Sequence, residues 1–471
     1  MSHKASPKKN TFDVIIIGAG PAGLFAAIEL SRFSSFDILL IDKGKNIEKR
    51  KCPSQISGKN CMKCKPCSLL FGWGGSGAFS DGKLTLTSEV GGTLSNYTSP
   101  AELEKLTTYV DNLYLSYGAP RELYDADDDY LKSIHRKAVL AHLLFIPYKI
   151  RHLGTDKCLE VVKAIRDDLD EKITILTEKE VKTIIVKNSQ AVGIRLASGE
   201  EFRANYVVVA PGRQGAEWLT GEAHRLNIKT LINPVDLGVR VEVPAEVAEP
   251  LTKNIYESKF LFYSKTFDDK VRTFCMCPYG EVVTEYSDGI LTVNGHSYKE
   301  KKTDNTNFAL LVSKTFTEPF KDPISYGQYI SRLANLLSGG VMIQRLGDLE
   351  TGRRSTVERI QKSILKPTLK SATPGDLSLV LPYRYLSSLI DMLKALDVVA
   401  PGIYSKYTLL YGVEVKFYSS RIEVNDRLET KIQNFFVAGD GAGITRGLLQ
   451  ASISGVLVAR ELMAREGMKG E

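Results

Sequence analysis

Residues 12–23 read F-D-V-I-I-I-G-A-G-P-A-G, and this segment indicates the fold of the surrounding chain. Residues 14–17 are a β-branched run, which is typical of a strand buried on both faces of a parallel sheet. Three glycines follow at once in G-x-G-x-x-G spacing, and helical periodicity continues to Leu30. Such glycines permit a tight turn, close approach of a pyrophosphate and close packing of helix on strand. The pattern predicts a dinucleotide site formed by Gly18, Ala19, Gly20, Pro21, Ala22 and Gly23.

A second strand and an acidic residue complete this unit. Residues 38–41 are apolar, and Asp42 follows them nineteen residues after Gly23. An acid at this strand end can bind a ribose hydroxyl, so we assign Asp42 and its neighbour Lys43 to the same site. A flexible glycine turn is the alternative, but strand, glycines, helix, strand and acid all agree with dinucleotide binding.

Composition limits the remaining choices. The chain has 471 residues, which allows two or three domains, and its hydrophobic content of 43% is that of a soluble globular protein. A net charge of +7 permits acidic ligands without indicating nucleic acid as a partner. No apolar run reaches the roughly 20 residues of a membrane helix, and no export signal is recognisable. We expect a cytoplasmic protein with reduced thiols, and a disordered basic tail over residues 1–10.

Four cysteines follow the second strand in C-x8-C-x2-C-x2-C spacing, among several lysines. All-sulfur ligation suits zinc or an iron–sulfur cluster, and nearby lysines stabilise thiolates. Two other interpretations stay open, a redox dithiol and inert thiols in a loop. The ligands of a metal site here would be Cys52, Cys61, Cys64 and Cys67. Cys275 and Cys277, by contrast, are expected to face opposite ways in a strand and to serve as packing residues.

Residues 72–84, G-W-G-G-S-G-A-F-S-D-G-K-L, form a glycine-rich stretch. So many glycines suit a backbone that runs close against a flat ligand. A linker is the alternative, although linkers seldom carry Trp and Phe between the glycines. We assign Gly74, Gly75, Ser76 and Gly77 to the cofactor site.

The identity of the dinucleotide follows from two resemblances. Residues 435–443, F-F-V-A-G-D-G-A-G, resemble the second FAD fingerprint of glutathione-reductase-type flavoproteins. Residues 206–213, Y-V-V-V-A-P-G-R, resemble the strand-to-glycine turn that crosses near FAD in those proteins. The resemblance implies FAD, with Asp440 on the ribityl chain and Val181 beside the adenine. The further cofactor residues that it implies are Ala210, Gly212, Arg213, Gly439 and Gly441.

The expected fold class is α/β, with a discontinuous Rossmann-like FAD-binding domain of the glutathione-reductase type. This domain comprises residues 11–224 and 431–471, with the cysteine-containing loop at 49–83, and an α+β substrate or cap domain is inserted at 225–430. Residues 225–430 contain no second G-x-G-x-x-G. NAD(P)H would therefore dock only transiently as a donor.

Three residues are catalytic candidates. Lys83 could stabilise the reduced flavin, or could be an exposed loop lysine. His152 lies beside a glycine turn and could reach a ligand, or could be structural. Glu414 could be a polar group near the flavin, or could pair with Lys416 on the same strand face.

The chain also resembles the FAD-dependent dehydrogenases of the group labelled NAD-utilising dehydrogenases, over most of its length and in order. The matching segments are G-A-G-P-A-G-L-F-A-A, the cysteine and glycine loops, I-R-H-L-G-T-D, A-P-G-R, L-G-V-R-V-E, C-M-C-P-Y-G-E-V-V, R-L-G-D and L-L-Y-G-V-E-V-K. The resemblance implies an oxidoreductase that moves a hydride or an electron pair between a small-molecule substrate and flavin. An electron-transfer protein is a further expected partner. The alternatives are a flavin-dependent RNA-modification protein and a flavin or thiol redox sensor without turnover.

Overall fold

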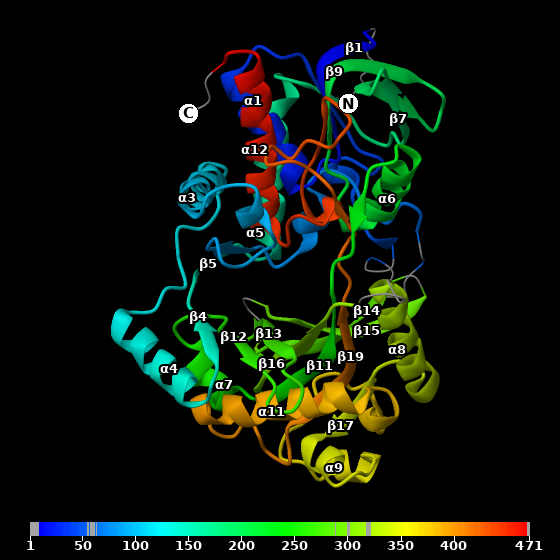
Figure 1. Cartoon of the computed structure of the whole chain (residues 1–471). Coiled ribbons are helices and arrows are strands. Elements are labelled where there is room, and N and C mark those ends of the chain that lie inside the picture. The colour runs from blue at the N-terminus through cyan, green and yellow to red at the C-terminus, as the bar shows by residue number, and fades with distance from the viewer. Residues whose placement is uncertain are drawn as a thin grey trace. The chain divides into compact units, whose positions relative to one another are not determined.

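A computed structural model describes residues 9–53, 56, 62, 64–287, 289–298, 302–316 and 322–468. The chain forms two compact units (Figure 1). The first comprises Met1–Leu123, Arg151–Leu231 and Ser419–Glu471, and the second comprises Tyr124–Ile150 and Ile232–Tyr418. Of the basic tail predicted over residues 1–10, residues 1–8 lie outside the described residues.

The first unit is built on a mixed sheet whose strand order is β6-β2-β1-β9-β8-β7, with β21 also paired to β9. Strands β6, β2, β1, β9 and β21 are mutually parallel, so their carboxyl ends meet at one edge of the sheet. Strands β7 and β8 form an antiparallel hairpin beside β9. The strands are β1 (Thr11–Ile17), β2 (Ile38–Ile41), β6 (Thr174–Leu176), β7 (Val181–Lys187), β8 (Gln190–Leu196), β9 (Glu201–Val209) and β21 (Phe435–Val437).

Helices α1 and α12 pack directly against each other in this unit (Figure 1). Gly455 of α12 makes the close packing possible, because a Cβ there would lie 2.0 Å from the carbonyl oxygen of Ala22 in α1. The helices are α1 (Pro21–Phe33), α3 (Pro100–Ser116), α5 (Thr155–Asp170), α6 (Ala216–Arg225) and α12 (Leu448–Arg465). Short elements complete the unit: β3 (Lys83–Leu86), β10 (Thr230–Leu231), β20 (Arg421–Ile422), and the 3-10 helices η1 (Ile47–Lys49), η2 (Gly75–Phe79), η3 (Leu94–Asn96), η4 (Arg213–Gly215) and η6 (Asp440–Ala442).

The second unit is built on an eight-stranded sheet of order β18-β17-β19-β11-β16-β13-β12-β4. All neighbours except β17 and β18 are antiparallel. The strands are β4 (Leu144–Ile146), β11 (Val235–Pro244), β12 (Lys259–Tyr263), β13 (Lys270–Cys277), β16 (Asn305–Lys314), β17 (Met342–Arg345), β18 (Thr373–Pro374) and β19 (Leu409–Lys416). A separate hairpin is formed by β14 (Glu281–Ser287) and β15 (Ile290–His296), and β5 (Lys149–His152) links the chain of this unit to the first.

Central strand β11 is buried on both faces, and its two faces differ in chemistry. Leu237, Val239 and Val241 belong to the apolar core, whereas Arg240 and Glu242 are buried polar residues of the opposite face. Alternate residues of a strand point to opposite sides, so this sequence places apolar packing on one face and a polar network on the other. The helices of the unit are α4 (Asp128–Leu140), α7 (Ala245–Thr252), α8 (Pro323–Ser338), α9 (Leu346–Glu350), α10 (Val357–Gln361) and α11 (Tyr383–Val399), with the 3-10 helix η5 (Leu377–Leu379).

Residues 124–150 group with the second unit, although the sequence predicts them to be part of the FAD-binding domain at 11–224. The reason is tertiary: β4 hydrogen-bonds to β12 and α4 packs against α11. The chain thus has an α/β unit and an α+β unit, and their roles in cofactor and substrate binding stay predictions. No helix in the described part of the chain is both long and apolar enough to cross a membrane.

Candidate functional site

The first glycine loop of the first unit has the geometry that its spacing predicts. Gly18 has a φ of +105°, and a Cβ there would lie 2.1 Å from the carbonyl oxygen of Ala210. A Cβ at Gly23 would lie 1.9 Å from the carbonyl oxygen of Gly18. Gly20 precedes α1, and among the described residues no side chain caps that helix. The amides of the first turn are therefore suited to an anionic ligand.

Asp42 holds this loop in place. Its carboxylate accepts hydrogen bonds from the backbone N–H groups of Ala19 at 2.9 Å and Gly44 at 2.7 Å. A carboxylate has about four acceptor positions, so these two bonds leave capacity for a ribose hydroxyl. Lys43 lies with Nζ 4.1 Å from the centroid of the Phe71 ring and 3.6 Å from a carboxylate oxygen of Glu180.

The glycine-rich loop lies against the first glycine loop. The N–H of Gly74 donates to the carbonyl of Ala19 at 2.7 Å, and a Cβ at Gly75 would lie 3.0 Å from the Cα of Gly20. A Cβ at Gly77 would lie 2.5 Å from a methyl group of Leu448, at the start of α12. Backbone packing of this kind requires residues without side chains. Ser76, in contrast, is exposed.

Arg50 is a functional candidate that was not predicted from the sequence, where it stands between Lys49 and Lys51 shortly before the cysteines. Its guanidinium is buried and donates to the backbone carbonyls of Ser68, Leu69, Trp73 and Gly75 at 2.5–2.9 Å. Burial lowers the pKa of Arg50 to about 10, against the opposing charge of Asp42. Arg50 thus joins the end of the cysteine segment to the glycine-rich loop. Its only sequence signal was a place in a run of basic residues.

The terminal motif meets the crossing turn at the same sheet edge. The N–H of Ala210 donates to the carbonyl of Ile17 at 2.8 Å, and a Cβ at Gly441 would lie 2.3 Å from the carbonyl oxygen of Gly212. Asp440 accepts from the Thr445 hydroxyl at 2.7 Å and the Gly447 N–H at 3.3 Å.

Burial raises the pKa of Asp440, although the positive charge of Arg213 acts in the opposite direction. Gly439 has a φ of +78°, and its N–H donates to the Ser454 hydroxyl at 3.0 Å. Val181 begins β7, shortly after a segment in which Lys179 donates its N–H to the carbonyl of Asp42.

These elements fit a pyrophosphate-containing dinucleotide. Helices α1 and α12 both begin with a glycine as N-cap and, within the described residues, without a capping side chain. The space beside Gly212 and Gly447 is open, because a Cβ at either position would meet no atom within 4 Å. The residues predicted from four separate sequence segments therefore come together within the first unit.

Two of the three catalytic candidates lie close to this assembly. Lys83 Nζ is 3.3 Å from a carboxylate oxygen of Asp81, and His152 is half-buried at the end of β5. The N–H groups of Leu153 and Gly154 donate to the carbonyls of Gly82 and Asp81, which brings the two segments together.

Glu414 lies elsewhere, in β19 of the second unit. Its carboxylate is fully buried, 3.1 Å from Lys416 Nζ and 3.3 Å from the Arg240 guanidinium. The pairing with Lys416 that was one interpretation of the sequence is therefore present. A catalytic role for Glu414 stays a prediction.

The cysteine loop is described only in part. Cys64 is exposed, Cys52 and Cys67 are half-buried, and Cys61 lies outside the described residues. Among the residues that are described, no group of three or more His, Cys, Asp or Glu side chains could hold a metal ion. A zinc or iron–sulfur site over the four cysteines stays a prediction.

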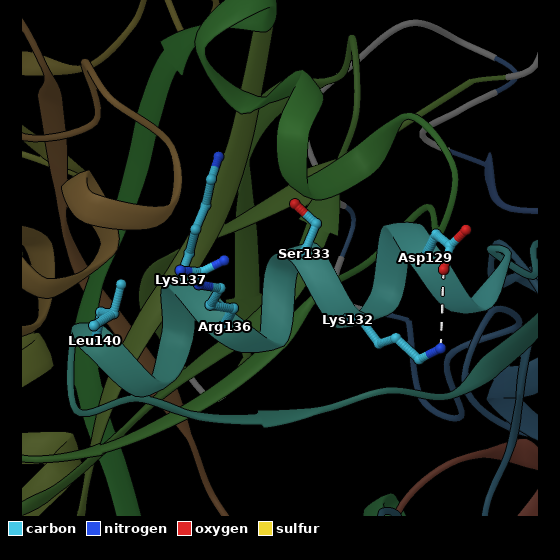
Figure 2. A pocket seen from close by; sticks show the side chains of 6 residues that line it. All are labelled: Asp129, Lys132, Ser133, Arg136, Lys137 and Leu140. Atoms are coloured by element: carbon cyan, nitrogen blue, oxygen red, sulfur yellow. Dashed lines mark ion pairs between the residues drawn. The ribbon is translucent and has the colours of Figure 1, made fainter.

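A hollow of about 480 Å³ lies along α4 in the second unit (Figure 2). All its lining residues come from this one helix, and Lys132 pairs with Asp129 across one helical turn at 3.8 Å. No residue assigned from the sequence lines it. The lining residues are Asp129, Lys132, Ser133, Arg136, Lys137 and Leu140.

Two family models match parts of the chain. Residues 12–66 match the pyridine nucleotide-disulphide oxidoreductase family, and residues 234–417 match the family described as FAD-dependent protein, C-terminal domain-like. An uncharacterized protein from Clostridium beijerinckii is 26% identical over 491 residues, with 96% of this chain and 80% of the relative covered. The two family descriptions agree with the predicted cofactor and with the predicted class of enzyme.

Solved structures similar to the chain include two dehydrogenases and one oxidase. The L-proline dehydrogenase from P. horikoshii has a TM-score of 0.39 at 13% identity, with 98% of this chain and 95% of that chain covered. The glycine oxidase from Geobacillus kaustophilus has a TM-score of 0.38 at 13% identity, with 97% and 95% covered. The 3-ketosteroid-delta4-(5alpha)-dehydrogenase from Rhodococcus jostii has a TM-score of 0.44 at 13% identity, with 98% of both chains covered. These sequence identities and TM-scores are too low to indicate a substrate.

Proposed function

We propose that the chain is an FAD-dependent oxidoreductase that moves a hydride or an electron pair between a small-molecule substrate and an FAD held by the first unit. The second unit is the proposed substrate domain, inserted into a glutathione-reductase-type FAD domain. NAD(P)H is proposed to act only as a transient donor. We also propose that the chain belongs to the NAD-utilising dehydrogenase group that its sequence resembles.

One observation carries this proposal: both ends of the chain contribute a glycine motif to a single sheet edge. The first motif follows β1 and the second follows β21, and both strands are parallel neighbours of β9. The amino termini of α1 and α12 are proposed to bind the pyrophosphate, with Asp42 on a ribose and Asp440 on the ribityl chain. The backbone at Val181 is proposed to contact the adenine.

When bound, FAD supplies two-electron chemistry at N5 of its ring system. The proposed task of the glycine-rich loop is to cover the cofactor, and Arg50 keeps that loop in one conformation through its bonds to Trp73 and Gly75. Lys83 is proposed to supply a positive charge there, and His152 to hold or accept a proton. Both residues come from segments joined by backbone hydrogen bonds.

The cofactor site is tested by replacing Asp440 and measuring flavin content. Purified protein should release about one FAD per chain on denaturation, because the two glycine motifs form one site. Asp440→Ala should lose most of the flavin while keeping a cooperative unfolding transition. The matched control is Asp426→Ala, since Asp426 is exposed and lies outside the site. A variant at Asp440 that retains full flavin would contradict the proposed ribityl contact.

The electron donor is tested by anaerobic reduction of the flavin-loaded protein. NADH, NADPH and a reduced ferredoxin are each added in turn, and the loss of the oxidised flavin absorbance is followed. Reduction by NADH or NADPH with saturation at high concentration would support transient nicotinamide docking. Reduction by the ferredoxin alone would instead favour an electron-transfer protein as the donor.

A further inference from the structure

Strand β13 of the second unit ends in Cys275-Met276-Cys277 and pairs with β16, whose other neighbour is β11 (Figure 1). The expectation that the two cysteines face opposite ways is wrong. Their sulfur atoms lie 4.0 Å apart. Residues two apart in a strand share a face, and only Met276 between them points to the other side.

The backbone around the two cysteines departs from regular strand geometry. Cys275 has a φ of +47°, which is uncommon for a residue with a side chain. The pairing of β13 with β16 also shifts register between Phe274 and Cys277, as at a β-bulge. Bulges redirect side chains and recur beside functional sites. The local conformation is held by the N–H of Cys275, which donates to a carboxylate oxygen of Glu257 at 3.0 Å.

A buried cation lies against this cysteine pair. Arg240 of β11 is fully buried, and its Nη2 donates to Cys277 Sγ at 3.2 Å and to the carbonyl of Cys275 at 2.7 Å. The same guanidinium donates to Asn307 at 2.8 Å and lies 3.3 Å from Glu414. A positive charge beside a sulfur stabilises the thiolate, the form that attacks disulfides. Glu414 keeps Arg240 in place and offsets part of that charge.

Glycines make room for this arrangement. A Cβ at Gly295 would lie 2.0 Å from Arg240 Nη2, and a Cβ at Gly280 would lie 2.9 Å from the Cβ of Cys277. The guanidinium can therefore reach the sulfur only because Gly295 has no side chain. Two thiols from β13 and one arginine from β11, the two strands that flank β16, form a compact group that simple hydrophobic packing does not require.

The two thiols differ in accessibility. Cys275 is half-buried, whereas Cys277 is fully buried. An external disulfide can thus reach Cys275 first, and Cys277 is placed to react only within the pair. Such a division into an attacking and a resolving cysteine is what thiol–disulfide exchange needs.

We propose that Cys275 and Cys277 form a redox-active dithiol that exchanges with small-molecule disulfides of the glutathione class. The Cys275 thiolate attacks one sulfur of the external disulfide, whose S–S bond breaks and releases one thiol. Cys277, next to Arg240, then attacks the sulfur of Cys275 and releases the second thiol. The two protons of the dithiol end on the two released thiols, and its two electrons reduce the external disulfide. The reverse reaction restores the dithiol.

The closed form should be easy to reduce. A disulfide bond is about 2.05 Å long, so the two sulfurs must approach each other by roughly 2 Å. Bridging residues two apart in a strand also strains the backbone, and strained disulfides have more oxidising potentials. The pair therefore resembles exchangeable rather than structural disulfides.

The test uses the full chain with oxidised glutathione and reads one tryptic peptide. Residues 273–299 lie between cleavage sites at Arg272 and Lys299 and contain no cysteine other than this pair. After incubation with oxidised glutathione, the remaining thiols are alkylated, the protein is digested with trypsin, and the mass of this peptide is measured by mass spectrometry. In oxidised protein the peptide should have the mass of the internal disulfide, which is two hydrogens less than that of the free dithiol, and neither cysteine should be alkylated. Treatment with reduced glutathione should restore alkylation of both cysteines.

Single variants distinguish the two roles. Cys277→Ser should accumulate a mixed disulfide with glutathione on Cys275, because the resolving thiol is missing. Cys275→Ser should form a mixed disulfide at least about tenfold more slowly, since access limits exchange at a buried thiol. Cys158→Ser, a buried cysteine of the first unit, is the control and should leave the peptide's oxidation unchanged.

Arg240 is a positioning residue in this scheme and has its own readout. Arg240→Lys keeps a buried positive charge but cannot reach Asn307 and both cysteines together, so the mixed disulfide should persist several-fold longer than in the wild type. A peptide that stays fully alkylated at both cysteines after oxidation would overturn the proposal. So would equal rates of mixed-disulfide formation in the two serine variants. The peptide is read in protein with and without flavin, so failure here is separate from failure of the proposed cofactor site.

Discussion

Gly455 should be intolerant of a single added methyl group. It lies in the buried part of α12, and an alanine Cβ would be 2.0 Å from the carbonyl oxygen of Ala22 and 3.0 Å from the N–H nitrogen of Ala26. These two groups are positioned as one i-to-i+4 step of α1, just after the first glycine loop. The added carbon can be accommodated only if α12 moves away from α1 by about 1 Å or more. Such a movement disrupts the surrounding core, because protein interiors are packed as densely as crystals of small organic molecules.

Two opposing effects determine how much Gly455→Ala changes the free energy of unfolding. Alanine gains about 1 kcal/mol over glycine in a helix interior. Overpacking of a dense core typically costs about 1–3 kcal/mol, and more where only backbone can move. We expect Gly455→Ala to lower the free energy of unfolding by roughly 1–2 kcal/mol. The altered start of α1 should also weaken flavin binding.

Gly221→Ala is the matched control for this substitution. Gly221 lies within α6 of the same unit, is exposed, and a Cβ there would meet nothing within 4 Å. The same change should therefore raise the free energy of unfolding by about 1 kcal/mol. Thermal unfolding and urea denaturation of both apoproteins measure the effect, with about 2–4 °C expected per kcal/mol for a unit of this size. If Gly455→Ala is as stable as Gly221→Ala, the close contact of α1 with α12 is not as described.

Three further predictions concern other parts of the chain. Arg50→Met leaves four loop carbonyls without their donor and should destabilise the first unit by at least about 2 kcal/mol in urea denaturation, with Arg50→Lys recovering less than half of the loss. Burial raises the pKa of Glu242, so the folded state binds its proton more tightly than the unfolded state does. That contribution to stability is present below the ordinary glutamate pKa of about 4.3 and is lost as pH rises through the raised pKa of the folded state. The free energy of unfolding, measured across pH 4–8, should therefore decline less with rising pH in Glu242→Gln than in the wild type. Anaerobic protein should contain zinc, or iron with matching acid-labile sulfide, if the predicted site is formed, whereas four freely titrating thiols would rule out a metal at Cys52, Cys61, Cys64 and Cys67.

The sequence alone predicted the conformation of the first glycine loop and of its neighbours in the first unit. Glycine spacing after a β-branched run reflects constraints that act within about thirty residues, because turn, strand and helix must follow in order. Gly18 and Gly23 are required by the local backbone, since a Cβ at Gly23 would lie 1.9 Å from the carbonyl oxygen of Gly18 and Gly18 itself has a φ of +105°. The pattern is therefore visible in the sequence without knowledge of distant contacts. The terminal motif at Asp440 is equally local, and its helix α12 follows within eight residues.

Tertiary structure decided which groups are already engaged and which distant segments meet. Arg50 is a member of a basic run by sequence, yet folding buries it among four carbonyls of a later loop. Asp42 was predicted for a ribose, and only the folded chain shows that it also accepts the N–H of Ala19.

The cysteine pair depended on tertiary structure most strongly. Alternation along β13 places Cys275 and Cys277 on one face, but the approach of Arg240 comes from a strand more than thirty residues earlier. That approach depends on Gly295, which comes from a separate hairpin. Contacts between residues so far apart leave no periodic signal in the sequence, because each strand satisfies its own pattern independently of the partner that it will meet.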